Sequence, residues 1–310
     1  DQGRQMSASV LQPGTLEPPA GGFPELRLPQ RSLFRTRAER LAALAEGHAL
    51  DDYLRFLAAL AGAQDAALAR LRNITLPEAA VLARAHEDRL PPLAAGSLHR
   101  DPAWRAALTD ILRALESTAV PAAARAVIAR LQAADDDSRE RMADTILGGD
   151  LARLDRAVIP FVAAALQVYW LHLVTSLGPE AFVPLATHAA CPCCGSGPVA
   201  SMVRIGGNEQ GLRYLTCSLC STQWHVVRIK CAFCESTKDI SYYGIEGGNA
   251  AIKAEHCDSC GSYLKILYME KDTNVDAVAD DVASLALDVL MAESGIARGG
   301  LNYYLIGGDA

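Results

Sequence analysis

Eight of the nine cysteines in this 310-residue chain stand in four Cys-x-x-Cys pairs, which are Cys191/Cys194, Cys217/Cys220, Cys231/Cys234 and Cys257/Cys260. Two thiolates separated by two residues can face one ion from a single tight turn, and two such turns complete a tetrahedral site of four sulfurs. Thiolate is a soft ligand that suits zinc or a single iron ion and excludes Mg2+ and Ca2+. The spacing therefore predicts two mononuclear metal sites, with zinc and iron both open.

The cysteine block repeats itself after 40 residues. Cys194 and Cys217 lie 23 positions apart, and so do Cys234 and Cys257. The same shift lays other residues on their counterparts, including Ser196 on Ser236, Gly207 on Gly247 and Val226 on Ile266. We interpret the block as an internal duplication of a C-x2-C-x22-C-x2-C unit.

Three other chemistries use paired cysteines and stay open. Structural disulfides require an oxidising compartment, and no secretory signal precedes the pairs. A thioredoxin-like redox pair needs one motif at a strand-to-helix junction, whereas here four motifs lie in a hairpin-rich segment. An iron–sulfur cluster also takes four cysteines, but its ligand spacings usually differ. Tandem repetition favours two mononuclear sites.

Four further residues near the pairs could bind a metal. Cys193, the ninth cysteine, lies between two candidate ligands, and we expect a small buried residue rather than a ligand or a reactive thiol. His188, His225 and His256 could each replace a cysteine ligand. Because eight cysteines already complete both sites, we expect packing or surface roles for these histidines.

Each unit must position its two pairs with a short hairpin. In the first unit the predicted strands cover 199–205 and 212–216, around the turn signal Gly206-Gly207-Asn208. In the second they cover 240–245 and 251–256, around Gly247-Gly248-Asn249. Neither unit has enough apolar residues for a core of its own, so bound metal should supply much of its folding energy.

The N-terminal half of the chain is helical by composition and periodicity. After an extended, proline-rich lead-in, helix signals begin near Thr36, and apolar residues then recur at three- and four-residue steps. The expected helices cover 51–72, 77–90, 101–115, 121–133, 137–147 and 150–177. Residues 158–174 are the only candidate membrane span, but Pro160, Gln167 and His172 interrupt it, which favours a buried core helix. This segment predicts a bundle of six or seven helices.

The C-terminal segment returns to helix. Residues 273–294 carry one apolar face, Thr273 with Asp276 predicts a capping box, and Gly295 ends the helix. The acidic residues of this segment predict a solvated face or an acidic docking surface. The apolar tail over 301–306 should pack back on the fold or meet a partner, with self-association open. The predicted domains are 1–35, 36–188, 189–230, 231–270 and 271–310.

The charge of the chain and the absence of catalytic motifs argue against a nucleic-acid binder and against an enzyme. The net charge is −7, and residues 189–270 carry seven Lys/Arg and seven Asp/Glu, so the metal modules lack the basic face that a nucleic-acid binder needs. The sequence contains no HExxH or GxSxG motif, and no glycine-rich phosphate loop stands out in the helical half. We therefore expect a non-enzymatic protein without a membrane span. We place it in the cytoplasm, where its cysteines would stay reduced or metal-bound.

Three motifs carry a family resemblance: CPxCGSxP over 191–198, CSLCxxxWHxxRxKCxxC over 217–234, and CDSCxxYLK over 257–265. The chain resembles the FdhE-type formate dehydrogenase accessory proteins. The resemblance implies a cytoplasmic chaperone-like role in maturation of the formate dehydrogenase catalytic subunit, which carries molybdenum and an iron–sulfur cluster. It also implies two rubredoxin-like iron sites, one with Cys191, Cys194, Cys217 and Cys220 as ligands, the other with Cys231, Cys234, Cys257 and Cys260.

The expected fold class is multidomain α plus small β. An N-terminal helical bundle precedes two tandem rubredoxin-like or zinc-ribbon-like metal modules and a C-terminal helix. The leading hypothesis is an assembly factor that binds the formate dehydrogenase catalytic subunit and carries two mononuclear irons, with zinc as the alternative occupant. The alternatives are a small iron electron-transfer protein or oxidoreductase subunit, and a zinc-ribbon binding module.

Overall fold

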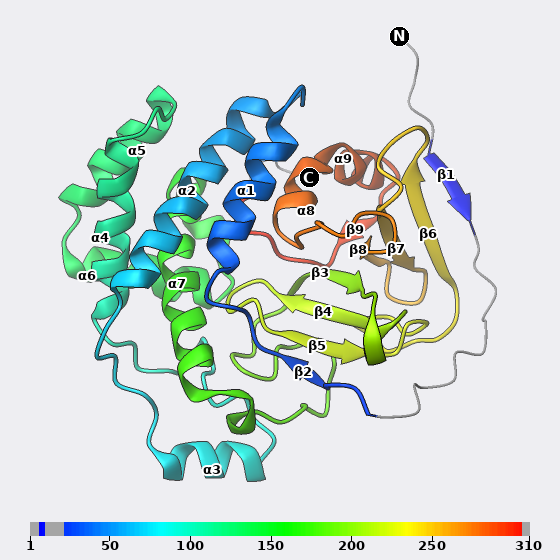
Figure 1. Cartoon of the computed structure of the whole chain (residues 1–310), viewed down its shortest axis with the longest axis horizontal. Coiled ribbons are helices and arrows are strands. Elements are labelled where there is room, and N and C mark those ends of the chain that lie inside the picture. Colours follow the sequence, from blue (N-terminus) through cyan, green and yellow to red (C-terminus); the bar gives the residue numbers. More distant parts are fainter. Residues whose placement is uncertain (1–5, 10–21, 306–310) are drawn as a thin grey trace.

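The computed structural model describes residues 6–9 and 22–305, and it places a helical bundle beside a single twisted sheet (Figure 1). The bundle contains α1 (Leu33–Ala45), α2 (Asp51–Arg70), α4 (Ala103–Glu116), α5 (Ala122–Ala133), α6 (Asp136–Leu147) and α7 (Ile159–Leu177), and α3 (Ala79–Glu87) stands apart from it. Buried apolar residues of the bundle and of the sheet form one continuous cluster. The predicted fold class is confirmed, although its two parts share a core.

Helix α7 is the central element of the bundle. Fourteen of its nineteen residues are buried, and α2, α4 and α6 all contact it. The segment Arg156–Leu177 is long and apolar enough to cross a membrane, but 83% of its most apolar window is buried inside the structure. It is therefore the buried core helix that the interrupting polar residues predicted. The apolar stripe of α4 is likewise buried, which the helical periodicity predicted.

Two predictions for the N-terminal half are wrong in detail. The first bundle helix begins at Leu33 rather than near Thr36, and the lead-in contains two strands, β1 (Met6–Ser9) and β2 (Leu26–Arg27); its residues 1–5 and 10–21 lie outside the described residues. The predicted helix over 150–177 is broken into two 3₁₀ turns before α7. The break occurs because Leu154 and Asp155 are extended and the Asp155 carboxylate accepts from the Ala157 N–H.

Within the described residues, nine strands form one sheet in the order β1-β6-β7-β8-β3-β4-β5-β2, with β9 paired to β8. The first unit contributes β3 (Pro198–Val203), β4 (Arg213–Cys217) and β5 (Gln223–Val226), and the second contributes β6 (Ile240–Ile245), β7 (Ile252–Cys257) and β8 (Ser262–Tyr268). A shift of 40 residues lays the first set on the second, so the duplication is also structural. The units join because β3 pairs in parallel with β8, with Ser201 opposite Ile266.

The third strand of each unit was missed by the hairpin prediction. β5 and β8 follow the second cysteine pair of their units and extend each hairpin to three strands. For β5 the signal was present, because polar and apolar residues alternate over Gln223–Val226, and the apolar ones are buried. A third strand gives each unit another edge for backbone pairing, and the pairing of β8 with β3 joins two units too small for separate cores into one sheet.

The C-terminal helix prediction also requires correction. Instead of one helix over 273–294, the structure has two short helices, α8 (Ala279–Ala283) and α9 (Leu285–Glu293), followed by β9 (Ala297–Arg298). The capping box is wrong, because Asp276 itself caps α8 by accepting from the Val278 and Ala279 N–H groups. The tail does pack back on the fold, with Asn302, Tyr303 and Tyr304 buried.

Acidic residues of the C-terminal segment are partly buried, which differs from the predicted solvated face. Asp280 and Asp281 are fully buried in α8. Asp280 pairs with Arg40 of the bundle, and Asp281 pairs with Arg298 at 2.6 Å. Lys265 of β8, also fully buried, donates to the Asp281 carbonyl at 2.8 Å. These contacts join α8 to the bundle on one side and to the sheet on the other.

Glu140 of α6 provides a pH-dependent link within the bundle. Its carboxylate accepts from Arg100 at 2.6 Å, Trp104 at 2.8 Å and Arg105 at 2.7 Å. Burial opposes ionisation, but these donors outweigh it and hold the pKa of Glu140 below its ordinary value of 4.5. The ionised form therefore stabilises the folded chain at pH above about 4.5, and that contribution is lost as pH falls through the lower folded-state pKa.

We expect Glu140→Gln to lower the free energy of unfolding by about 1–2 kcal/mol at pH 7. The difference between wild type and variant should shrink as pH falls below about 4.5, because the wild-type carboxylate is then protonated too. Urea unfolding of both chains at several pH values measures this difference. A difference that stays constant from pH 7 to pH 3 would contradict the role of the charge.

Candidate metal centres

The four Cys-x-x-Cys turns share one backbone conformation. In each turn the residue after the second cysteine has a positive φ: Gly195 (75°), Ser221 (59°), Glu235 (61°) and Gly261 (72°). Glycine adopts this left-handed backbone region freely, whereas each of Ser221 and Glu235 is destabilised by about 1 kcal/mol or more in it. The Cys191 and Cys231 N–H groups donate to Ser196 and Ser236 carbonyls at 2.9 and 2.8 Å, so the duplicated turns are also closed alike.

The first site brings together Cys191, Cys194, Cys217 and Cys220, whose sulfurs all lie within 4.8 Å of one another. The Sγ–Sγ distances are 3.5 Å for Cys191–Cys220 and 3.4 Å for Cys194–Cys217. A tetrahedral ion with metal–sulfur bonds near 2.3 Å requires sulfurs about 3.8 Å apart. A disulfide requires about 2.05 Å. The geometry thus fits one ion held by four sulfurs.

The second site brings together Cys231, Cys234, Cys257 and Cys260 in the same way. Its Sγ–Sγ distances are 3.8 Å for Cys231–Cys260 and 3.6 Å for Cys234–Cys257. All eight residues named from the sequence therefore fall into the two expected groups of four. Their role as metal ligands stays a prediction.

In the absence of a cation, it costs free energy to ionise the buried thiols of the first site. Burial raises the pKa of the Cys191 and Cys217 thiols well above their usual range, because a thiolate there loses its hydration. Burial acts on Cys220 too, but hydrogen bonds from the neighbouring thiols outweigh it and hold the pKa of Cys220 well below its usual range. In the second site burial raises the pKa of Cys231 to about 12, whereas the Ser236 backbone N–H lowers that of the exposed Cys234. A bound cation would supply the charge that stabilises four neighbouring thiolates in either site.

The segment between α3 and α4 contacts the first site through backbone hydrogen bonds, although no pattern in the sequence singled it out. The Leu93 and Ala95 N–H groups donate to the Cys193 and Cys194 carbonyls, both at 2.9 Å. The Trp170 indole of α7 donates in turn to the Leu93 carbonyl at 2.9 Å. In the sequence, Pro91-Pro92 indicated only the end of a helix. A contact with a turn about 100 positions further along the chain produces no periodic pattern in the sequence, so the docking of Leu93 and Ala95 could not be predicted.

Two more residues support the first site from outside the sheet. Gln167 of α7 donates to the Ser218 carbonyl at 2.9 Å, within the second turn of the site. Tyr303 of the tail is buried beside Ser218, Cys217 and Cys194. The interruption of an apolar helix by Gln167 was a usable signal, since a buried amide needs hydrogen-bond partners.

The remaining candidates have the expected surroundings. Cys193 is fully buried, and its thiol interacts with those of Cys191 and Cys220 without joining the group of four. His225 packs against the rings of Phe23 and Tyr214, and His256 against that of Tyr243. The His188 carbonyl accepts from the Trp224 indole at 2.9 Å.

We expect Cys193→Ser to leave both sites loaded, because four other sulfurs already complete the first site. Metal analysis of the purified variant should give the wild-type ratio of metal to protein. The cost should be confined to stability, about 1–2 kcal/mol for a polar group in an apolar position. Loss of one metal equivalent would make Cys193 a ligand.

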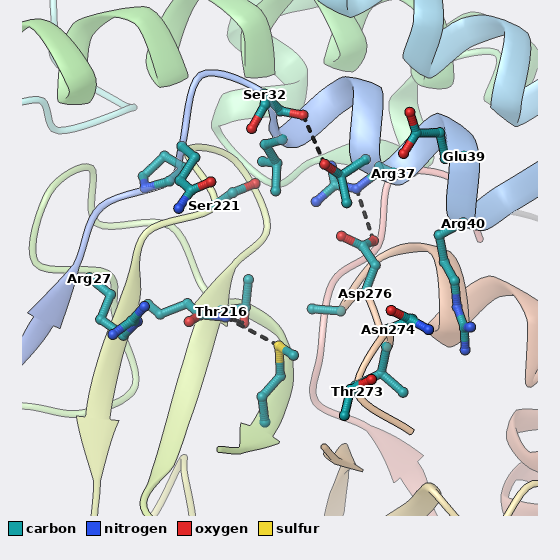
Figure 2. A pocket seen from close by; sticks show the side chains of 18 of the residues that line it. Arg27, Ser32, Arg37, Glu39, Arg40, Thr216, Ser221, Thr273, Asn274 and Asp276 are labelled. Carbon is teal, nitrogen blue, oxygen red and sulfur yellow. Dashed lines mark hydrogen bonds and ion pairs between the residues drawn. The ribbon is translucent and has the colours of Figure 1, made fainter. Parts of the chain in front are cut away.

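A cavity of about 520 Å³ lies close to the first site, between α1, the sheet and residues 273–277 (Figure 2). Ser221, next to the ligand candidate Cys220, belongs to its lining. Arg37 donates to Asp276 at 2.9 Å across the cavity wall, and Arg40 pairs with Asp272. The described residues that line it include hydroxyl, carboxylate and guanidinium groups, among them Ser32, Glu39 and Arg40.

The chain matches three family models in succession. Residues 23–187 match "FdhE, N-terminal", residues 190–228 match "FdhE, central domain" and residues 229–305 match "FdhE, C-terminal domain".

Similar proteins span almost the whole chain. The "Protein FdhE homolog" of Pseudomonas aeruginosa is 42% identical over 308 residues, covering 98% of this chain and 99% of that protein. The homolog of Edwardsiella ictaluri is 46% identical over 293 residues, covering 93% and 94%. The crystal structure of the FdhE protein from Pseudomonas aeruginosa aligns with a TM-score of 0.85 at 41% identity, covering 92% of this chain and 100% of the other. At this identity and coverage, the chain belongs to the FdhE family.

Proposed function

We propose that the chain is a non-enzymatic assembly factor for a formate dehydrogenase. It acts in the cytoplasm, binds the catalytic subunit before that subunit is complete, and carries one iron ion in each group of four cysteines, with zinc as the alternative occupant. The domain limits 1–35, 36–188, 189–230, 231–270 and 271–310 stay part of this proposal.

The observation that carries the proposal is membership of the FdhE family across bundle, central and C-terminal segments together. The sulfur geometry of both groups supports metal binding, since distances of 3.4 to 3.8 Å suit one tetrahedral ion. Four thiolates serve zinc and a single iron equally well, so the preference for iron rests on the family resemblance.

Two measurements test the proposal. Affinity-tagged chain should capture the formate dehydrogenase catalytic subunit from extracts of the parent cells, and deletion of its gene should lower formate dehydrogenase activity. Protein purified without oxygen should contain about two metals per chain and no acid-labile sulfide. If the catalytic subunit is not captured and deletion leaves the activity unchanged, the assembly role is wrong whatever the metal content.

One observation favours electron transfer as a second candidate. Cys234 and Cys260 are exposed, so an iron ion in the second site would have an edge open to a redox partner. Reversible bleaching of an iron–thiolate absorption band by a physiological reductant, at turnover rates, would support that role. A colourless zinc protein would remove it and leave the assembly role standing.

A further inference from the structure

The two groups of cysteines differ in their access to solvent although their turns are duplicates. Cys191, Cys194, Cys217 and Cys220 are at most 1% exposed. In the second group Cys231 and Cys257 are buried, whereas Cys234 and Cys260 are exposed. The exposed pair contains one cysteine from each turn, so one edge of that sulfur tetrahedron faces solvent.

The first site is sealed by elements from both ends of the chain. Leu93 and Ala95 cover its first turn, Gln167 binds its second turn, and Tyr303 lies over both. Each of these residues is itself held in the continuous core, for example through the Trp170–Leu93 hydrogen bond. A reagent can reach these four sulfurs only after the bundle or the tail separates from the sheet.

The second site lacks a comparable cover among the described residues. From outside the second unit, Lys230 pairs with Glu235 at 2.6 Å, the His188 N–H lies 3.5 Å from the Glu235 carboxylate, and Gly299 lies against the Phe233 ring. These contacts leave Cys234 and Cys260 exposed. On the open side, the Ser259 hydroxyl donates to the Ser236 hydroxyl at 3.0 Å and joins the two turns. Both serines are polar surface groups that can exchange this bond for water.

We propose that the two sites have separate tasks: the first holds its ion as a permanent cross-link between the two turns on which the bundle packs, and the second exchanges its ion with external ligands. This inference rests on the proposal that both sites bind a metal. It adds that only the second site is open to an incoming thiol or nitrogen chelator.

Exchange requires only ligand substitution. A donor atom of the incoming ligand approaches through the open edge and bonds to the ion. The bond to Sγ of Cys234 or Cys260 breaks, and the released thiolate takes a proton from water. The remaining sulfurs are displaced in the same way, and no oxidation state changes. The first site offers no such edge, so its exchange waits for a larger opening of the fold.

The test uses the full chain loaded with two equivalents of zinc, which has no redox chemistry. An excess of the colorimetric chelator 4-(2-pyridylazo)resorcinol is added, and zinc release is followed by absorbance. We expect one equivalent to leave at least about 100-fold faster than the other, because only the slow one needs sub-global opening. N-ethylmaleimide added after the fast phase, followed by peptide mass spectrometry, should label Cys231, Cys234, Cys257 and Cys260 and leave the first group unlabelled.

Variants of the tail test the cause. Tyr303→Ala should accelerate the slow phase at least about 10-fold by removing the cover, whereas Tyr303→Phe keeps the ring and should leave it slow. Leu112→Ala is the matched control, because it creates a cavity in α4 of the bundle core without touching either site. If Leu112→Ala accelerated release as much as Tyr303→Ala, general destabilisation would explain the effect.

The outcomes separate this inference from the function on which it rests. Release of both equivalents at one rate, or early labelling of Cys191, Cys194, Cys217 and Cys220, would overturn the division of tasks while leaving two metal sites. A protein that takes up no metal at all would overturn the metal-binding proposal itself. The wild-type kinetics and labelling decide the matter even if the Tyr303→Ala variant fails to fold.

Discussion

Cys217→Ser is expected to destabilise the whole chain and not only its sheet. The substitution removes one of the four proposed ligands of the first site, at the end of β4. Binding of zinc to structural sites of this kind contributes about 10–16 kcal/mol to folding. A domain has a net stability of about 5–15 kcal/mol, so even part of this loss is decisive. Because the Leu93 and Ala95 N–H groups of the helical half donate to the Cys193 and Cys194 carbonyls, the loss of stability should extend to the helices.

This expectation goes beyond the sequence analysis, in which the bundle and the metal modules are separate domains. The continuous apolar cluster couples them, so we expect the loss of helical circular dichroism on heating to begin at much lower temperature in Cys217→Ser. Cys260→Ser is the matched control, because it also removes one ligand but from the exposed site. It should lose one metal equivalent, while the helices of the bundle should still unfold at the wild-type temperature. Metal analysis with thermal unfolding measures both, and a Cys217→Ser protein that still carried two ions would refute the ligand assignment.

Asp281→Ala should cost about 3–5 kcal/mol of unfolding free energy, because it leaves buried cations without their partner. Lys265 and Asp281 are both fully buried, and Arg298 lies 2.6 Å from the Asp281 carboxylate. Although burial opposes ionisation, Arg298 and Lys265 hold the pKa of Asp281 below its ordinary value. Without the Asp281 carboxylate, Asp288 is the carboxylate that remains to pair with both cations.

Urea unfolding of wild type and variant measures this cost. The double variant Asp281→Ala/Lys265→Met should lose less than the sum of the two single variants, since it removes a cation together with its partner. Asp150→Ala is the control for charge removal as such, because Asp150 pairs with Arg153 on the surface and should change stability by no more than about 1 kcal/mol. An Asp281→Ala cost equal to that of Asp150→Ala would show that the buried pair contributes nothing.

Local spacing made much of the candidate site predictable. A Cys-x-x-Cys pair fixes two sulfurs within one turn, and the 40-residue repeat groups the four pairs two by two, so the composition of both sites followed from the sequence. Helical periodicity likewise predicted the stripe of α4, and polar interruptions in a long apolar run predicted the buried position of α7. These features depend on residues a few positions apart, whose relative placement is set by backbone geometry alone.

Contacts between distant segments were decided only by the tertiary structure. The parallel pairing of β3 with β8, the docking of Leu93 and Ala95 on the first site, and the burial of Tyr303 beside Cys194 join residues that are between 65 and 109 positions apart. Two duplicate units have nearly the same local signals, yet one is sealed and the other open, because the bundle can pack against only one of them. The sequence by itself determined which cysteines meet, and the packing of the whole chain determined which of them meet solvent.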